Sequence, residues 1–351
     1  MSDPTSIDRA TSEDVLRVRD LVVHFSGRRV AGRASTVRAV DGVSFEIARG
    51  EILALVGESG CGKSTIATSV MRLTQPTSGQ ILSGGEDLAK LRGAQLRRAR
   101  RRIQMIFQDP FGSLDPRQSV FDAVEEPLVI HSVGATPEER RDRVMRALDF
   151  AHLRPPERLA RAYPHELSGG QRQRVAIASA MVLGPELVIA DEPVSMLDVS
   201  ARSGILRLMV DLRDRLGVSY LFITHDLAVA WVVADRIAVV YLGRIVEIGP
   251  CESVVAAPAH PYTTALLAVT SEEDLPTEGD PSPTGSTEVL AGETPSAVNV
   301  PPGCRFHPRC PRYRTLGEPE VCRVSDPVLR AVSGNDGLVR ECACHFPEGV
   351  S

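Results

Sequence analysis

The sequence predicts an α/β fold in which short buried strands alternate with helices. Three apolar runs support this prediction, namely "EILALV", "ELVIADE" and "SYLFITHD". Each is short and continuous, as expected of a strand that is buried on both faces of a parallel sheet. A glycine-rich segment, "GESGCGKST", directly follows the first run and precedes the helical stretch "STIATSVMRL". A strand, a glycine-rich loop and a helix in this order are typical of a phosphate-binding α/β core.

The composition is that of an ordinary water-soluble protein. The chain has 351 residues, of which 43% are hydrophobic and 24% are charged, so it can bury a sizeable core and hold more than one structural unit. A formal net charge of -5 gives no sign of nucleic-acid binding, and we expect no nucleic-acid partner. We interpret the arginine run at 97–102 as a solvated helix face rather than as a patch for nucleic acid or lipid.

No membrane-spanning or secreted segment is predicted. No apolar run reaches the ~18 residues that a membrane-spanning helix needs, and the N-terminus "MSDPTSIDRATSEDVL" lacks the apolar centre of a signal peptide. We therefore expect a protein of the cytosol, so that any role at a membrane depends on a partner.

The first part of the chain contains a β-rich region and, further on, a helical one. A polar tail at 1–15 precedes β-rich runs between Val18 and Ile47, which predict antiparallel hairpins with turns at "SGRRVAGRAS" and "DG". Residues about 109–184 are polar, arginine-rich and without a strong strand pattern, which predicts a helical subdomain inserted into the α/β core. The segment "RIAVVYLGRIVEIG" predicts a hairpin over a Gly243–Arg244 turn.

The C-terminal part differs in composition. Residues 271–303 are rich in proline, glycine, serine, threonine and acidic residues, which predicts a linker or a loosely held arm. A small cysteine-rich tail at 304–346 follows. The chain therefore divides into a nucleotide-binding domain at 16–258 and a C-terminal extension at 259–351.

The glycine-rich loop has the spacing of a Walker A motif. Its glycines let backbone N–H groups curl around phosphates, and the following helix adds the positive end of its dipole. Lys63 would reach the β- and γ-phosphates, and the Ser64 hydroxyl would ligate Mg²⁺. The alternative is a glycine-rich turn that happens to contain lysine. The residues expected to bind ATP are Gly57, Glu58, Ser59, Gly60, Cys61, Gly62, Lys63, Ser64 and Thr65.

Two later strand ends carry the groups that would complete this site. After "LVIA", Asp191 would hold Mg²⁺ through water, and Glu192 is placed to polarise the attacking water. His225, after "YLFIT", is a candidate contact for the γ-phosphate. Acidic residues at a strand end are often merely solvated. Two in tandem, in a chain that also has a phosphate loop, favour the catalytic interpretation.

A second anion-binding helix start lies more than a hundred residues after the first. In "LSGGQ", Ser168 can cap a helix whose first turn leaves backbone N–H groups free to meet an anion. On its own this motif would be a helix start and no more. Here it precedes the acidic strand end, at Asp191, by some 20 residues.

Together these motifs resemble the ATP-binding-cassette (ABC) ATPases over about Leu16 to Pro258. The resemblance implies that the fold is the P-loop ABC cassette, with a parallel-sheet core, an antiparallel β subdomain and an inserted helical subdomain. It also implies that Gln108 acts with Mg²⁺ and the γ-phosphate, that Asp198 belongs to the D-loop, and that Phe25 stacks on adenine. In this family the signature of one subunit closes over ATP held by the other subunit's Walker A loop. The signature residues are Leu167, Ser168, Gly169, Gly170 and Gln171.

A narrower resemblance points to the ATPase subunits of oligopeptide and dipeptide importers. It rests on "MIFQDPFGSLDPR", "YPHELSGGQRQR", "HPYTTALL" and "PPGCRFHPRCP". It implies a peripheral protein on the cytoplasmic face of the cell membrane, docked on two transmembrane permeases to which an extracytoplasmic binding protein delivers peptide. A second cassette, either a paralogue or an identical chain, would complete the assembly. The same role for nickel or another solute, or a non-transport ABC ATPase, remains an alternative.

The tail contains enough thiols for a metal centre. Four cysteines could hold Zn²⁺ or a [4Fe–4S] cluster, although their spacing matches neither common pattern: Cys304, Cys310, Cys322 and Cys344. The resemblance to the importer branch, some of whose members carry a [4Fe–4S] cluster here, favours the cluster and Cys344 as its last ligand. Cys342 could substitute for Cys344. Reduced cysteines without metal are the remaining alternative.

Overall fold

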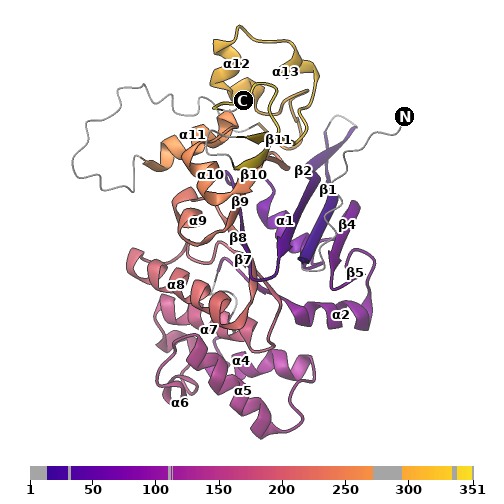
Figure 1. Cartoon of the computed structure of the whole chain (residues 1–351). Helices are drawn as coiled ribbons and strands as arrows, with labels where there is room; N and C mark the ends of the chain where they lie inside the picture. The colour runs from indigo at the N-terminus through magenta and orange to yellow at the C-terminus, as the bar shows by residue number, and fades with distance from the viewer. Residues whose placement is uncertain are drawn as a thin grey trace, which may run out of the picture.

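The structure is a computed structural model that describes residues 14–30, 33–109, 112, 114–271, 295–333 and 338–349. Most of the expected N-terminal tail and of the expected linker lies outside these residues. The molecule is elongated, with α4, α5 and α6 at one end, α12 and α13 at the other, and two sheets between them (Figure 1). In the described part of the chain, no helix is long and apolar enough to cross a membrane.

The core of the molecule is an eight-stranded sheet in the order β11-β12-β10-β9-β3-β8-β7-β6. Its strands are β3 (Ile52–Val56), β6 (Ile103–Ile106), β7 (Leu187–Asp191), β8 (Ser219–Thr224), β9 (Arg236–Tyr241), β10 (Arg244–Pro250), β11 (Arg330–Ser333) and β12 (Val339–Cys342). The five from β9 to β6 are parallel, and β10, β12 and β11 continue the sheet in antiparallel pairs. The predicted α/β class with a parallel core is confirmed.

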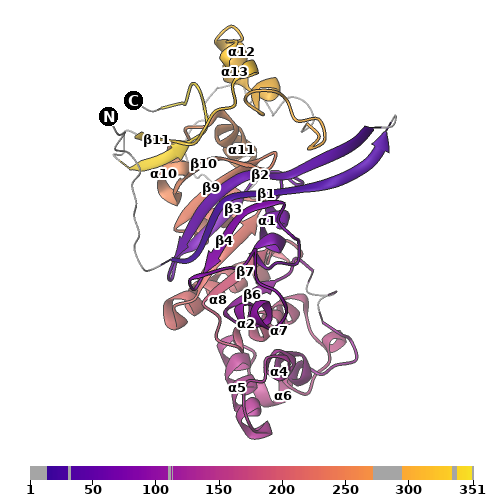
Figure 2. The same cartoon turned by 90° about the vertical axis from the view of Figure 1, so that its right-hand side faces the viewer.

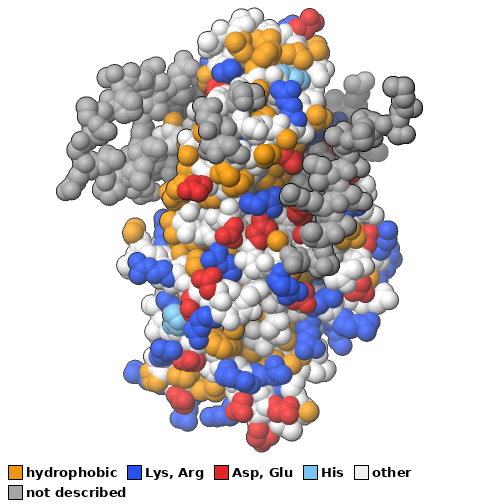
Figure 3. Space-filling model, in the orientation of Figure 1, with side chains coloured by type: hydrophobic (Ala, Val, Ile, Leu, Met, Phe, Trp, Pro, Cys, Tyr) orange, Lys and Arg blue, Asp and Glu red, His pale blue; other side chains and the backbone are white. Residues whose placement is uncertain are grey.

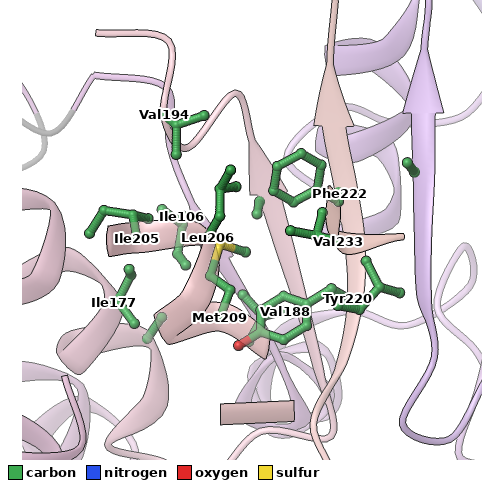
Figure 4. Close-up of a cluster of buried hydrophobic side chains, with 14 of the residues drawn as sticks. Ile106, Ile177, Val188, Val194, Ile205, Leu206, Met209, Tyr220, Phe222 and Val233 are labelled. Carbon is green, nitrogen blue, oxygen red and sulfur yellow. The ribbon is translucent and has the colours of Figure 1, made fainter. Parts of the chain in front are cut away.

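The parallel strands form because their side chains are buried on both faces. Every residue of β3, β7 and β8 is buried. Figure 4 shows how one face is covered: Phe222 of β8 lies near Leu206 and Met209 of α8 (Val199–Leu216). The opposite face packs on α1 (Lys63–Val70) and on the second sheet through a separate apolar cluster.

The second sheet is antiparallel, in the order β2-β1-β4-β5. It consists of β1 (Asp14–Val30), β2 (Arg33–Ala48), β4 (Ser78–Ser83) and β5 (Glu86–Asp87). β1 and β2 are longer than the sequence suggested and run through most of "SGRRVAGRAS" as a ribbon that projects from the molecule (Figure 2). The predicted turn at Asp41–Gly42 is wrong. These residues lie inside β2, where the β1–β2 register shifts and Gly42 has φ 86°, so the glycine serves a bulge.

The region between β6 and β7 contains only helices among its described residues. They are α4 (Val120–Ile130), α5 (Pro137–Phe150), α6 (Pro156–Leu159), the 3₁₀ turn Pro164–Glu166, and α7 (Gly169–Met181). Capping side chains begin the longer ones, Ser119 for α4 and Thr136 for α5. On the face shown in Figure 3, basic and acidic side chains are interspersed over this end of the molecule. The arginine run forms α2 (Gly93–Arg102), in which Ala99 alone is buried.

The β9–β10 hairpin turns one residue earlier than expected. Its two-residue loop is Leu242–Gly243, not Gly243–Arg244, and both residues have positive φ, 43° and 76°. This is the conformation that matches the twist of a tight hairpin. The close approach of the Ala39 carbonyl, 2.8 Å from where a Cβ on Gly243 would lie, also requires glycine there.

The cysteine-rich tail is not a separate appendage. β12 pairs with β10 and so extends the main sheet, and Phe306 is buried among Tyr241 and Tyr262 of the core. The remaining elements of this part are α9 (Leu227–Val233), α10 (Cys251–Ala256), α11 (Pro261–Ser271), the 3₁₀ turn His307–Arg309, α12 (Pro311–Thr315) and α13 (Val321–Val324). The described residues of the tail therefore share the core of the main domain.

Candidate active site

The predicted catalytic residues follow parallel strands that end at one edge of the main sheet. The glycine-rich loop follows β3, Glu192 follows β7, His225 follows β8 and Gln108 lies just beyond β6. The carboxyl ends of parallel strands are where α/β proteins place their ligand sites. The topology therefore brings together residues that are up to 168 positions apart, from Gly57 to His225.

The phosphate loop is held in shape by its own lysine and by close backbone packing. The Lys63 ammonium group donates to the carbonyls of Gly57 at 2.6 Å and Glu58 at 3.0 Å, and the side chain is only 5% exposed. Gly62 has φ 110°, and a Cβ there would lie 2.2 Å from the Ala39 carbonyl oxygen. Glycine is therefore required where the loop enters α1, and the backbone N–H groups of the first turn are left to meet phosphate.

The two side chains predicted to hold Mg²⁺, Ser64 and Asp191, lie together beside this loop. The Ser64 hydroxyl donates to the Asp191 carboxylate at 3.2 Å. Burial raises the pKa of Asp191, and the neighbouring Glu192 carboxylate raises it further, against the lowering effect of the Ser64 hydrogen bond. A hydroxyl and a buried carboxylate are the hard oxygen donors that Mg²⁺ prefers, and a bound cation would offset the cost of ionising Asp191. These residues fit the expected Mg²⁺ site.

Glu192 is the centre of a three-residue cluster. Its carboxylate accepts from the Gln108 amide at 3.0 Å and contacts Nδ1 of His225 at 3.2 Å. Glu192 has φ 47°, a conformation uncommon for a residue other than glycine, and its backbone N–H donates to the Ile223 carbonyl. Three residues predicted separately from sequence therefore meet at one carboxylate, beside Asp191.

The signature motif forms the N-terminus of α7. Ser168 accepts from the Gln171 N–H at 3.3 Å, and the Gln171 side chain accepts from the Ser168 N–H at 3.0 Å, a reciprocal capping box. Ser168 is exposed, whereas Leu167 is buried and anchors the motif in the helical region. The expected helix start is present. It belongs to the helical region, whereas the Glu192 cluster lies at the edge of the sheet.

Two other predicted site residues, Asp198 and Phe25, lie in described elements. Asp198 caps α8 by accepting from the Ala201 N–H at 2.8 Å and from the Ser200 hydroxyl at 2.6 Å, which fixes the D-loop at the helix start. Phe25 is on β1 with 43% of its surface exposed, so its ring is available for stacking.

Sequence reasoning missed the C-terminal contacts on the phosphate loop. The Glu58 N–H donates to the Tyr262 hydroxyl at 2.9 Å, and the Arg309 guanidinium donates to both oxygens of the Glu58 carboxylate at 3.0 Å each. Tyr262 belongs to the "HPY" segment and Arg309 to "CRFHPRC". Both segments were recognised as distinctive, but nothing in their residue types indicated that they pack on the phosphate loop.

The four predicted metal-binding cysteines share one small cavity. Cys304, Cys310, Cys322 and Cys344 line a space of about 20 Å³, whereas Cys342 is buried in β12, against Ala259 and Val332. Burial raises the pKa of each of the four thiols, to about 12 for Cys304 and about 11 for Cys344. The structure thus places Cys344 rather than Cys342 with the other three.

The arrangement of these thiols is not a finished metal site. Among the described residues, no three or more His, Cys, Asp or Glu side chains are grouped so that they could hold a metal ion. A cavity of about 20 Å³ also has room for little more than one water molecule. The donor set fits a thiolate-bound group in its chemistry, but the space between the thiols would have to widen to admit a cluster.

Comparison with known proteins supports the same interpretation of both parts of the chain. A family model described as "ABC transporter" matches residues 40–195, and one described as "Oligopeptide/dipeptide transporter, C-terminal region" matches residues 246–315. A di/tripeptide transport ATP-binding protein, DppF, of Pseudomonas aeruginosa is 44% identical over 96% of this chain and 98% of its own length. An oligopeptide transport ATP-binding protein, AppF, of Bacillus subtilis is 45% identical over 96% of this chain and 98% of its own.

Solved structures match the cassette region. A dimeric ATP-binding cassette, MJ0796, in a post-hydrolysis state bound to ADP and phosphate has a TM-score of 0.60 and 31% identity. The match covers 67% of this chain and 98% of that one. The cassette cbiO1 of Clostridium perfringens, part of the transporter complex cbiONQ, also has a TM-score of 0.60 and 31% identity, over 70% of this chain and 92% of its own.

Proposed function

The chain belongs to the ABC transporter ATPases, as an ATP-binding subunit of the peptide-importer branch, and we propose that it powers uptake of dipeptides or oligopeptides. The observation that carries the proposal is the convergence of Ser64, Asp191, Gln108 and His225 on one site around Glu192. The relatives are named for di/tripeptide and oligopeptide transport, which supports peptide as the solute class.

The chemistry follows from this arrangement. The phosphate loop and Lys63 bind the triphosphate, and Ser64 with Asp191 would hold Mg²⁺, which supplies positive charge to the phosphates when bound. Glu192 orients and polarises the attacking water as general base. Gln108 and His225 fix the Glu192 carboxylate through the two contacts at 3.0 and 3.2 Å. We also assign to His225 a contact with the γ-phosphate.

The signature motif acts on a nucleotide bound by another cassette. Its N–H groups at the start of α7 form an exposed anion-binding helix start, while Glu192 and the phosphate loop of the same chain form their own site. We therefore assign the two nucleotide sites of the assembled transporter to two cassettes in head-to-tail contact. The MJ0796 cassette is described as dimeric, which supports a pair of cassettes. Binding of ATP would close this contact, and hydrolysis would release it and drive the permeases.

An affinity purification tests the transport assignment. Tagged full-length chain is retained from detergent-solubilised membranes of its host, and everything bound is identified by mass spectrometry. We expect two polytopic permeases and a second cassette subunit of different sequence, on the cytoplasmic face of the membrane. Recovery of soluble partners alone would contradict the transport assignment and leave the ATPase assignment standing, whereas recovery of this chain as the only cassette would replace the paralogue with a homodimer.

We also propose that the tail holds a [4Fe–4S] cluster through Cys304, Cys310, Cys322 and Cys344. Their common cavity supports this assignment, together with the chemistry of four thiols as cluster ligands. The cluster would hold this part of the chain in place. Zinc, which also takes four thiolates, is the alternative metal.

Metal and sulfide analysis of anaerobically purified full-length chain tests the cluster. We expect about four irons and four acid-labile sulfides per chain, an absorption band of the cluster, and loss of all three in Cys322→Ser. Cys342→Ser removes a thiol outside the cavity and should keep the iron. Stoichiometric zinc, or no metal in the unsubstituted chain, would reject the assignment.

A further inference from the structure

We propose that Arg309 and Tyr262, from the C-terminal part of the chain, are positioning residues for the phosphate loop. Neither residue belongs to a nucleotide-binding motif, and both are buried. Both act through Glu58, the second residue of the loop. The inference concerns nucleotide binding by this chain and does not depend on which solute the transporter carries.

Glu58 is held from two sides. The Arg309 guanidinium makes a two-pronged contact with its carboxylate, at 3.0 Å to each oxygen, and the Tyr262 hydroxyl accepts from its backbone N–H at 2.9 Å. Arg309 is 7% exposed and Tyr262 is fully buried. Paired guanidinium–carboxylate contacts of this kind are both strong and directional. One contact therefore fixes the side chain of Glu58 and the other fixes its backbone.

The two anchoring residues stand on a rigid base. The rings of Tyr262, Tyr241 and Phe306 are in mutual contact, with centroids 4.6 to 5.4 Å apart. Phe306 lies three residues before Arg309, in the same short segment of the tail. This aromatic base is part of the main core, so movement of Arg309 or Tyr262 would disturb well-packed side chains.

A second arginine of the tail is linked to another residue of the loop, Cys61, through the β9–β10 turn. Arg305 pairs with Asp41 and donates to the Leu242 carbonyl in the β9–β10 turn. The Gly243 N–H of that turn donates to the Cys61 carbonyl of the loop at 2.8 Å. Arg305 and Arg309 each adjoin a cysteine of the tail cavity, Cys304 and Cys310. The cysteine segment therefore contacts the phosphate loop at two points, directly at Glu58 and, through the β9–β10 turn, at Cys61.

These contacts should govern affinity more than turnover. A loop that is already held in its binding conformation need not be ordered by the nucleotide. In a looser loop only a fraction of the chains has the binding conformation, and the apparent affinity for nucleotide falls in proportion to that fraction. ATP and ADP both bind through this loop, so we expect these contacts to act on both nucleotides. Loss of Arg309 should therefore raise KM and weaken ADP binding, with kcat little changed.

Titration calorimetry of full-length Arg309→Met with ADP tests the inference. We expect affinity about fivefold to tenfold weaker than in the unsubstituted chain. In steady-state kinetics KM for ATP should rise by a similar factor, with kcat within twofold. Arg314→Met removes the same charge from an exposed position of α12 and should leave affinity unchanged. Tyr262→Phe deletes only the hydroxyl and should weaken ADP binding about threefold.

A double-variant cycle decides whether Arg309 acts through Glu58. Glu58→Gln removes the charged partner, and we expect the double variant to bind ADP no more weakly than Arg309→Met alone. Arg309→Lys keeps the charge but not the two-pronged geometry. Its ADP affinity should lie between those of the unsubstituted chain and Arg309→Met, which provides a test even if Arg309→Met does not fold.

Unchanged ADP affinity in folded Arg309→Met, or additive effects in the double variant, would overturn the inference. An increase in KM that vanishes when affinities are corrected for the fraction of folded chain would also overturn it. ADP binding requires neither permeases nor a second cassette, so these outcomes are independent of the transport proposal.

Discussion

The phosphate loop before α1 and the signature at the start of α7 are both anion-binding helix starts, but they differ in how many residues of the same chain pack around them. The phosphate loop enters α1 with Lys63 turned into it, glycines packed against neighbouring backbone, and Glu58 held by two residues from the C-terminal part. The signature at the start of α7 is exposed, and Ser168 and Gln171 there hydrogen-bond with each other.

The difference indicates that this chain surrounds the phosphate loop with its own nucleotide-binding groups, whereas the signature depends on groups from another chain. We propose that a nucleotide at the first loop meets Lys63, the Mg²⁺-holding pair Ser64 and Asp191, and Glu192, all from the same chain. The second loop, at the start of α7, offers backbone donors, the Ser168 hydroxyl and the Gln171 amide. It follows that substitutions in the first loop should affect one chain on its own, while substitutions in the second should be felt when two cassettes meet.

The largest expected effect comes from Glu192→Gln. Removing the general base should lower ATPase turnover on the order of 10³-fold while leaving ATP bound, and it should therefore accumulate closed cassette pairs. Phosphate release and size-exclusion chromatography with ATP measure the two effects. Glu186→Gln, which neutralises a half-exposed carboxylate at the entry to β7, is the control and should be active. Undiminished hydrolysis in Glu192→Gln would remove Glu192 from its assigned role.

The comparison of the two loops is tested by Lys63→Met against Ser168→Ala. Lys63→Met deletes the cation of the first loop, and we expect about 30-fold weaker ADP binding by the chain on its own. Ser168→Ala should leave ADP affinity within twofold, because the second loop does not contribute to a nucleotide held by its own chain. Titration calorimetry measures both, and a large loss of ADP affinity in Ser168→Ala would break the comparison.

Acid should destabilise the segment that holds the phosphate loop, because His260 contacts Tyr262 there. Burial lowers the pKa of His260 to about 3, and Nδ1 of its ring accepts from the Tyr262 N–H at 3.0 Å, so the folded state holds it neutral. The unfolded chain binds the proton below about pH 6.5, so this residue's contribution to stability is present above that pH. The contribution is lost as pH falls toward 3, by up to ~1.4 kcal/mol per pH unit.

Thermal unfolding between pH 4 and 6.5 measures this dependence. His260→Gln should show a smaller slope of stability with pH than the unsubstituted chain. His152→Gln changes a half-exposed histidine and should keep the full slope. Equal slopes in His260→Gln and the unsubstituted chain would mean that His260 does not cause the dependence.

The smallest expected effect separates the signature from an ordinary helix start. Ser168 caps α7 and Ser119 caps α4, each in a capping box, so alanine at either position should cost about 1 kcal/mol of unfolding free energy. Only Ser168→Ala should also lower the ATPase activity of the assembled transporter. Denaturant unfolding measures the loss of stability, and phosphate release measures ATPase activity. Equal losses of ATPase activity in both variants would mean that Ser168 acts only as a helix cap.

The nucleotide motifs could be predicted because their function depends on local geometry. The glycine spacing before Lys63, the buried run before Asp191 and the capping box at Ser168 each follow from rules that act over a few residues, and each element forms at the expected place. Turn positions were less certain. Glycines such as Gly42 and Gly243 show where positive φ is needed, but they do not show whether the backbone is turning or bulging.

What sequence alone determined about this protein is the set of groups that can bind and hydrolyse ATP, and the family from which they come. Only the tertiary structure decided what holds them. It brought Gln108 and His225 to Glu192, chose Cys344 over Cys342 for the tail cavity, and placed Arg309 on Glu58, 251 residues away. The physical reason is that motif chemistry acts within one turn or loop, whereas support is provided by whichever distant side chains the packed core brings into contact.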